Sequence, residues 1–199
     1  MADICISAVS ADVQPNCSNP TFAGLEQIGY LLNKADVGDY TKELSRSNVF
    51  TSIPAKEGKR AYKLYVNTKN PFDGTKTEME QGDVANLFTH TVAFIVRDDG
   101  PDVNLNIITP LANGQFVAIL EEKWKNVPKD NSFVVFGMST GLVATSVAKP
   151  YTDGANAGAW QIELQESGAA QSAMYLWAGS YDSTKAMLES MSEPQQNQP

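Results

Sequence analysis

Apolar and polar residues alternate with a period of two through much of this chain, and turn-forming residues interrupt the alternation about every ten positions. The strongest run covers 87–96. Phe88, His90 and Val92 fall on one face of this run, whereas the residues Val92–Val96 are apolar on both faces. Because a strand covered on both sides needs two apolar faces, the pattern predicts a central, doubly covered strand.

The spacing then changes from two to that of a helix. Asp99-Gly100-Pro101 ends the strand and offers a helix start, and Asn113-Gly114 offers a helix end. The apolar stripe between them consists of Val103, Ile107, Ile108 and Leu111. We expect a helix that lies across the sheet and is shortened or kinked at Pro110, which lacks a backbone N–H.

Further strands follow from the same alternation. They are expected at 28–32, 49–53, 61–66, 115–120, 133–137, 142–148, 160–165 and 173–178. A short helix over 183–191, capped by Asp182, closes the ordered part. The fold class predicted is mainly β, a β-sandwich or barrel of about nine strands with one central helix and a short C-terminal helix. Residues 1–191 form a single domain.

Three segments lack a core pattern. Residues 1–24, with apolar residues at 4–9 and prolines at 15 and 20, are expected to form an extended arm on the sheet or on a neighbour. Residues 192–199 read as a polar tail. Within 67–86, the stretch 73–83 holds four acids and one lysine, and Met79 is the only apolar residue of 75–83. This stretch is predicted to be a mobile loop or a protruding arm that orders against another subunit.

Charge narrows the possible partners. The net charge of −8 disfavours tight binding to nucleic acid, because phosphates would be repelled. Residues 34–63 are the basic exception, with seven Lys or Arg against four acids, and Lys56–Arg60 reads as a turn that is solvated or contacts an acidic neighbour. No apolar run is long enough for a membrane span or an export signal, so we expect a protein made in a cytosol, with Cys5 and Cys17 as free thiols.

Residues suited to catalysis are few. His90 is the only histidine and lies in mid-strand, where a packed or hydrogen-bonded role is the more common one. Asp98, Asp99 and Asp102 suit a helix N-terminus better than a calcium site. The sequence predicts no enzyme, no cofactor and no metal. Aromatic residues, including Trp124 and Tyr151, leave open a carbohydrate-binding or adhesion sandwich.

An ordered series of short segments carries a resemblance to a known family. The series comprises Asn16-Cys17-Ser18-Asn19-Pro20, Gly24-Leu25-Glu26, Tyr30–Asp36, Phe88–Phe94, Gly114–Glu121, Phe136-Gly137, Gly141-Leu142 and Gly158-Ala159-Trp160. In this order they resemble tail tube and tail-ring structural proteins of phages that infect Bacteroides-type gut bacteria. The resemblance spans most of residues 4–178, and no single motif in it is diagnostic.

The resemblance implies a virion protein, made in the host bacterial cytoplasm, that assembles into rings or a tube and lets DNA pass without specific binding. Its partners would be further copies of itself, in a ring of unknown number, and other phage tail or neck proteins. A head–tail connector or tail-completion ring is an alternative within the same group. The inter-subunit residues implied are Asp73, Thr75, Thr77, Glu78, Met79, Glu80 and Gln81 in the arm, and Lys56, Lys59 and Arg60 in the basic turn.

Overall fold

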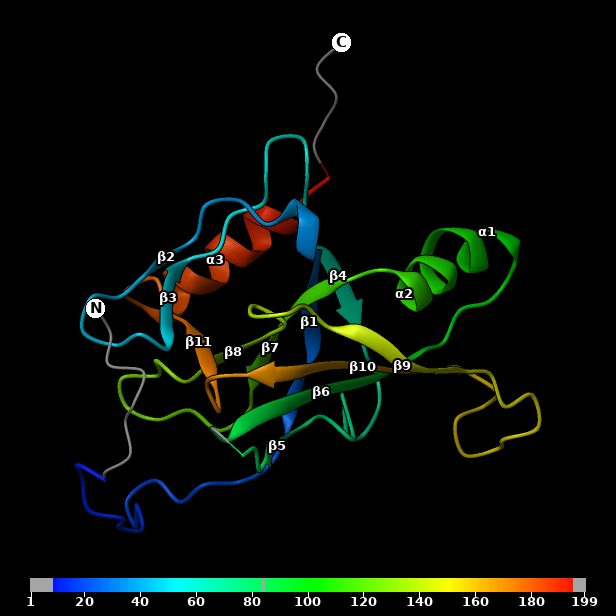
Figure 1. The fold of residues 1–199 in the computed structure, drawn as a ribbon. Helices are drawn as coiled ribbons and strands as arrows, with labels where there is room; N and C mark the ends of the chain where they lie inside the picture. Colours follow the sequence, from blue (N-terminus) through cyan, green and yellow to red (C-terminus); the bar gives the residue numbers. More distant parts are fainter. Residues whose placement is uncertain (1–8, 84, 195–199) are drawn as a thin grey trace.

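Two antiparallel-rich sheets lie face to face in the computed structural model, which describes residues 9–83 and 85–194 (Figure 1). The larger sheet has seven strands in the order β2-β3-β11-β8-β7-β1-β4. Their bounds are β1 Leu25–Asn33, β2 Thr41–Lys42, β3 Val49–Ser52, β4 Tyr62–Tyr65, β7 Phe116–Glu122, β8 Phe133–Phe136 and β11 Met174–Leu176. The mainly β fold with two sheets confirms the predicted class.

The smaller sheet has four strands in the order β5-β6-β10-β9. Their bounds are β5 Lys76–Glu80, β6 Leu87–Val96, β9 Val143–Ala148 and β10 Trp160–Ala169. Every pairing in this sheet is antiparallel, and β6 and β10 form its centre. Only β3 and β11, in the larger sheet, pair in parallel among the strands described.

Two apolar clusters hold the layers together, one on each face of the larger sheet. The first lies between the sheets and includes Leu120, Phe136 and Leu164. The second lies between the larger sheet and the C-terminal helix α3 (Tyr181–Ser192), and it includes Ile119, Val135 and Leu188. Successive residues of β7 point to opposite faces, so this strand is buried along nearly its whole length.

The doubly covered strand is therefore β7 rather than β6, where the sequence placed it. In β6, Val92 and Phe94 face the first cluster, as predicted. The other face of β6 carries Thr89 and Thr91. Both side chains are buried, but no further sheet or helix among the described elements covers this face. Both strands are apolar in the middle, and the amino-acid pattern alone does not say which of them α3 will cover.

A continuous helical segment crosses one end of the sandwich, and its middle is a π-helix. It consists of α1 (Pro101–Val103), the π-helical η2 (Asn104–Ile108) and α2 (Thr109–Asn113). Because Pro110 has no N–H to donate to the residue four positions earlier, the chain widens before it, and the N–H of Thr109 donates to the carbonyl of Asn104. Ile108 and Leu111 still reach the first cluster, so the predicted helix forms with a local widening.

Several element predictions need correction. Lys76–Glu80 is a strand, β5, and its partner is β6 of the same chain. Glu80 lies beside Leu87, and Lys76 lies beside Thr91. The sequence pattern also missed the two-residue strand β2 and the 3-10 turn η1 (Lys34–Asp36). Ser180, not Asp182, caps α3, since its hydroxyl accepts the N–H of Ser183 at 3.1 Å.

Parts of the predicted termini lie outside the described residues. These are positions 1–8, which include Cys5 and most of the apolar 4–9 stretch, and positions 195–199 of the tail. Residues 9–24 contain no helix or strand, and a turn lies at 17–18.

A buried carboxylate joins the two sheets. Glu166 of β10 accepts three backbone N–H groups from the turn after β8, those of Gly137, Ser139 and Thr140, at 2.7 to 2.8 Å. The Nζ of Lys34 donates to the carbonyl of Met138 in the same turn at 2.6 Å. Since Glu166 is fully buried, these donors replace the water that its charge would otherwise need.

We predict that Glu166→Gln destabilises the fold by about 2–4 kcal/mol, because the amide retains one acceptor oxygen and places its N–H₂ against at least one of the three N–H donors. The free energy of unfolding from urea titration measures the loss. Glu163→Gln is the matched control, since Glu163 lies on the same strand and points away from the first cluster. Equal stability of the two variants would contradict the role given to Glu166.

Candidate inter-subunit surface

Most of the predicted arm residues lie on the edge strand β5. Thr77, Glu78, Met79 and Glu80 belong to this strand, all of whose residues are exposed, and Met79 is 58% exposed. Asp73 and Thr75 lie in the turn before it, where the Thr75 hydroxyl accepts the N–H of Ala93 at 3.1 Å. Gln81 follows the strand and is exposed. The arm residues therefore gather along one border of the smaller sheet.

The outward face of the smaller sheet is mostly polar, with Leu87, Ile95 and Val143 as its larger apolar members. The register puts Lys76, Glu78 and Glu80 of β5 on this face together with Thr89 and Thr91 of β6. On β10 and β9 the same face carries Gln161, Glu163, Gln165 and Ser146. Lys76 pairs with Glu78 at 2.7 Å, and Glu80 accepts a hydrogen bond from the hydroxyl of Thr89. This face has acids in excess over its one lysine.

The predicted basic turn lies elsewhere. Lys56 donates to the carbonyl of Ala35 at 2.7 Å, and Lys59 pairs with Asp36 at 3.5 Å. Arg60 donates to the carbonyl of Ser192 at 3.3 Å, and its guanidinium lies over the ring of Tyr62. The turn thus fastens η1 and the end of α3 to the entry of β4.

The structure does not bring the basic turn and β5 together. In Figure 1 the turn between β3 and β4 is the cyan loop at the top of the molecule, and β5 lies at the bottom. Two groups at opposite ends of one subunit cannot contact each other within it. Any contact between them would have to join two copies.

His90 is held in the core by both ring nitrogens. Its Nε2 donates to the carbonyl of Gln171 at 3.1 Å, so its Nδ1 accepts the hydroxyl of Thr77 at 2.8 Å. Its ring also meets Phe136 edge-on, with centroids 5.9 Å apart. The strand β5 is therefore fastened to the body of the subunit through this histidine, a link that the lone His in the sequence did not reveal.

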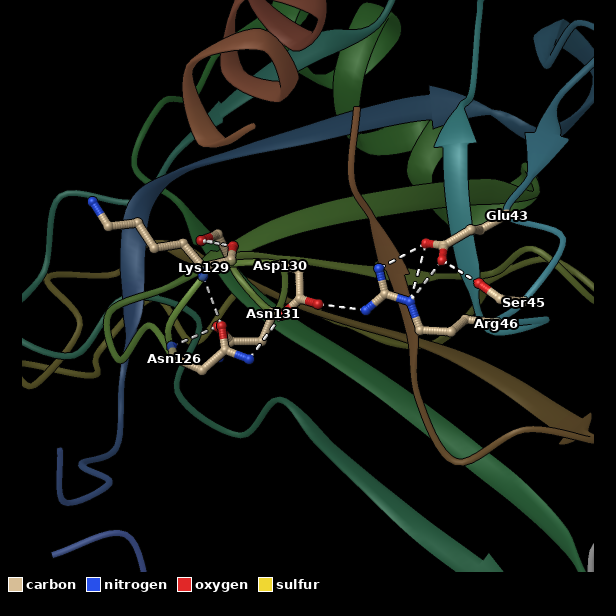
Figure 2. Close-up of polar contacts among 8 residues, drawn as sticks. Glu43, Ser45, Arg46, Asn126, Lys129, Asp130 and Asn131 are labelled. Atoms are coloured by element: carbon tan, nitrogen blue, oxygen red, sulfur yellow. Dashed lines mark hydrogen bonds and ion pairs between the residues drawn. The ribbon is translucent and has the colours of Figure 1, made fainter. Parts of the chain in front are cut away.

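Polar contacts centred on Arg46 join two loops that are far apart in the sequence (Figure 2). Arg46 donates to Glu43 at 2.7 to 3.1 Å and reaches across to Asp130. Asn126 donates to Asp130 at 2.7 Å and accepts the N–H of Lys129 at 2.9 Å. The β2–β3 loop and the β7–β8 loop are thereby fixed to each other. Nothing in the sequence pattern pointed to this cluster, because its members are 84 positions apart.

The carboxyl groups of this cluster are stabilised in their charged form. Hydrogen bonds from Arg46 hold the pKa of Glu43 below its ordinary value. Burial alone would raise the pKa of Asp130, but hydrogen bonds from Arg46 and Asn126 outweigh it, so this pKa is also lowered. The cluster therefore depends on pH in the acid range.

A cavity of about 990 Å³ opens beside the β7–β8 loop. Its walls include Trp124, Tyr175 and Phe72, with Glu122 and Asn131 as polar members. Asn131 donates to the carboxylate of Glu122 at 2.8 Å, and burial raises the pKa of Glu122. The indole N–H of Trp124 has no hydrogen-bond partner among the residues that the structure describes. Apolar rings and hydrogen-bonding groups thus share one hollow.

Other candidates take ordinary structural roles. Asp99 pairs with Lys149, and a hydrogen bond from Lys149 lowers the pKa of Asp99. Tyr151 is 80% exposed, with Lys149 also lying over its ring. In residues 9–83 and 85–194, no group of three or more His, Cys, Asp or Glu side chains is placed to hold a metal, and no helix there is long and apolar enough to cross a membrane. Cys17 is exposed and free.

Comparisons with known proteins give no relative for this chain. No protein-family model, no curated protein sequence and no solved structure matches it.

We predict that Arg46→Gln lowers the thermal unfolding midpoint at pH 7 by roughly 2–4 °C. The folded-state pKa values of Glu43 and Asp130 lie below their unfolded values, so their stabilisation is present above about pH 4 and is lost as the pH falls through the folded values. The gap between the variant and the parent chain should therefore shrink at pH 3.

The control for this prediction is Arg97→Gln, since Arg97 is exposed and has no ion pair among the described side chains. Melting curves followed by circular dichroism at pH 7 and pH 3 provide the measurement. A gap that stays constant or grows at pH 3 would contradict the assignment.

Proposed function

We propose that this chain is a structural subunit of a bacteriophage tail, which assembles into a ring or tube through which DNA passes. The observation that carries the proposal is the smaller sheet, because neither of its border strands, β5 and β9, has a further strand paired on its outer side among the residues described. The helix α2 packs against β9, and Leu142, just before β9, is bridged to Phe116. Free strand edges offer unpaired backbone groups to another chain. A sheet open at both borders can be extended by further copies on either side.

The strand directions favour joining by rotation. Since β5, β6, β10 and β9 are successively antiparallel, β5 and β9 run in opposite directions. When a second copy is rotated about an axis outside the sheet, its β5 meets the first copy's β9 in antiparallel order. Repeating this head-to-tail contact produces a closed ring when the rotation divides a full turn.

The composition of β9 supports it as an interface. Val143–Ala148 contains no charged residue, although α2 packs against this strand, and a covering element is one of the devices that protect a border strand. By contrast β5 carries Lys76, Glu78 and Glu80, but the register directs these three to the outward face of the sheet. They would stay hydrated in the assembly while the backbone of β5 pairs.

The outward face supports its role as the lining of a passage. It carries Glu78, Glu80 and Glu163 against Lys76, so a closed barrel of such sheets would line its hole with acids. Acidic walls repel phosphates and would let DNA slide without sticking. The basic turn Lys56–Arg60 lies at the opposite end of the subunit from β5 and would face a stacked ring. A neck or tail-completion ring would use the same contacts.

Cross-linking tests the pairing. In a Cys5→Ser/Cys17→Ser background, we expect Glu78→Cys combined with Ser146→Cys to give a ladder of covalent multimers with a short bismaleimide, because both side chains lie on the outward face at opposite borders. The highest band of the ladder reports the ring number. Gel electrophoresis under denaturing conditions provides the measurement.

The single variants are the matched controls. Neither Glu78→Cys nor Ser146→Cys alone should form a ladder, since each copy then lacks a partner thiol in the head-to-tail contact. Dimers from a single variant would instead indicate two-fold pairing of like borders, which cannot close a ring of many copies. Negative-stain microscopy of the concentrated full chain that shows only monomers would also count against the assembly.

The cavity beside Trp124 favours a second candidate function, the binding of a carbohydrate. Aromatic rings that stack on a sugar and a Glu122–Asn131 pair that can hydrogen-bond hydroxyls are typical of such sites. This function predicts a hit on a glycan array that Trp124→Ala weakens at least about tenfold, whereas Tyr151→Ala, outside the cavity, leaves it unchanged. An array without a hit would dismiss it.

A further inference from the structure

An apolar groove of about 740 Å³ runs between the border strand β4 and the helical segment. Leu31, Leu64 and Phe116 form part of its floor, and Ile107 and Pro110 of the helical segment form one wall. Ile107 is 41% exposed and Tyr62, at the rim, is 46% exposed. The groove therefore offers apolar surface to solvent on the side of the subunit away from α3.

The rim strand of this groove has a free edge. Among the described strands β4 pairs only with β1, and the N–H of Val66 donates to the carbonyl of Gln27. Bonded pairs alternate along an antiparallel ladder, so Leu64 and Tyr62 bond to β1, and the backbone groups of Lys63 and Tyr65 point away from it. An added strand could therefore pair with β4 and lay one of its faces into the groove.

The chain itself contains a segment with the matching pattern. In Val9-Ser10-Ala11-Asp12-Val13, apolar and polar residues alternate, as they do in a strand with one buried face. Val9 is 85% exposed and Val13 is 95% exposed, so neither is buried against an apolar partner among the residues that the structure describes. Five residues of strand span about 17 Å, which suits the four residues of β4 and the groove beside them.

This segment is led away from the groove of its own subunit. The side chain of Asn19 donates to the carbonyl of Lys125 at 2.9 Å, which ties the arm to the β7–β8 loop on the far side of β1 from β4. In Figure 1 the arm, in dark blue, lies at the lower left, and the helical segment lies at the upper right. The groove that could receive the arm is thus the groove of another copy.

We propose that residues 9–13 of one subunit add a strand to β4 of a second copy of this chain and bury Val9 and Val13 in the groove beside Ile107. The contact is heterologous, since the arm and the groove lie on different sides of the subunit, and it can link copies in series. It uses neither β5 nor β9, so it does not depend on the ring proposed above.

Photo-cross-linking in the full chain tests this contact. A benzophenone amino acid replaces Ile107, and the sample is an equal mixture of ¹⁵N-labelled and unlabelled protein. After trypsin, we expect the peptide that contains position 107 to be joined to the arm peptide that ends at Lys34, with attachment within residues 9–13. Half of the joined pairs should carry one labelled and one unlabelled peptide, because the two come from different copies.

The same replacement at Leu105 is the matched control. Leu105 lies on the same helical segment and is 69% exposed, but it does not line the groove, so it should give at least about tenfold less of this product. Adding Val9→Asp and Val13→Asp to the Ile107 variant should remove the product, because charged side chains oppose burial in an apolar groove.

Three results would overturn the proposal. The first is joined peptide pairs without mixed labelling, which would place the arm in the groove of its own subunit. The second is attachment outside residues 9–13. The third is a yield no higher than that of the Leu105 control. Cross-links between Glu78→Cys and Ser146→Cys report the β5–β9 contact separately. Either contact can therefore fail while the other is observed.

Discussion

Burial of the larger sheet on both faces is the constraint on which the rest of this structure depends. Ile119 and Val135 of β7 and β8 face α3, while Leu120 and Phe136 face the smaller sheet. Neither β7 nor β8 can therefore be exposed on either side without loss of one cluster. The C-terminal helix and the smaller sheet are each held in place by the same two strands, so the three layers form together.

Polar links then set how the layers meet. Glu166 of the smaller sheet accepts hydrogen bonds from three backbone N–H groups of the turn after β8. His90 links β5 to the segment at Gln171 through its two ring nitrogens. Each link is buried or nearly so, where an unpaired group would be costly. Such links leave little freedom in how the smaller sheet lies on the larger one, and they direct its polar face outward.

The borders of the sheets are where the subunit remains open to other molecules. The border strands differ in chemistry: β9 has no charged residue, β5 is charged, and β4 borders the apolar groove. Each would select a different kind of contact. A mostly polar face whose border strands lack a further paired strand among the residues described favours the proposed assembly around a passage, and an arm with exposed valines favours the proposed exchange between copies. In both proposals, each subunit contributes one surface to the copy on one side and a different surface to the copy on the other side.

The fold class, the positions of most strands and the helix over 101–113 could be predicted from the amino-acid sequence, because these follow from local alternation and spacing. The sequence also indicated that 73–83 has no apolar face. The pairing of Lys76–Glu80 with β6 could not be predicted in this way, since a strand held by backbone hydrogen bonds and by Thr77 beside His90 needs no apolar pattern of its own. The Glu43–Arg46–Asp130 cluster, the partners of Glu166 and the groove beside Ile107 likewise join residues far apart in the chain. No local pattern encodes such contacts, because they depend on which strands become neighbours when the apolar clusters close.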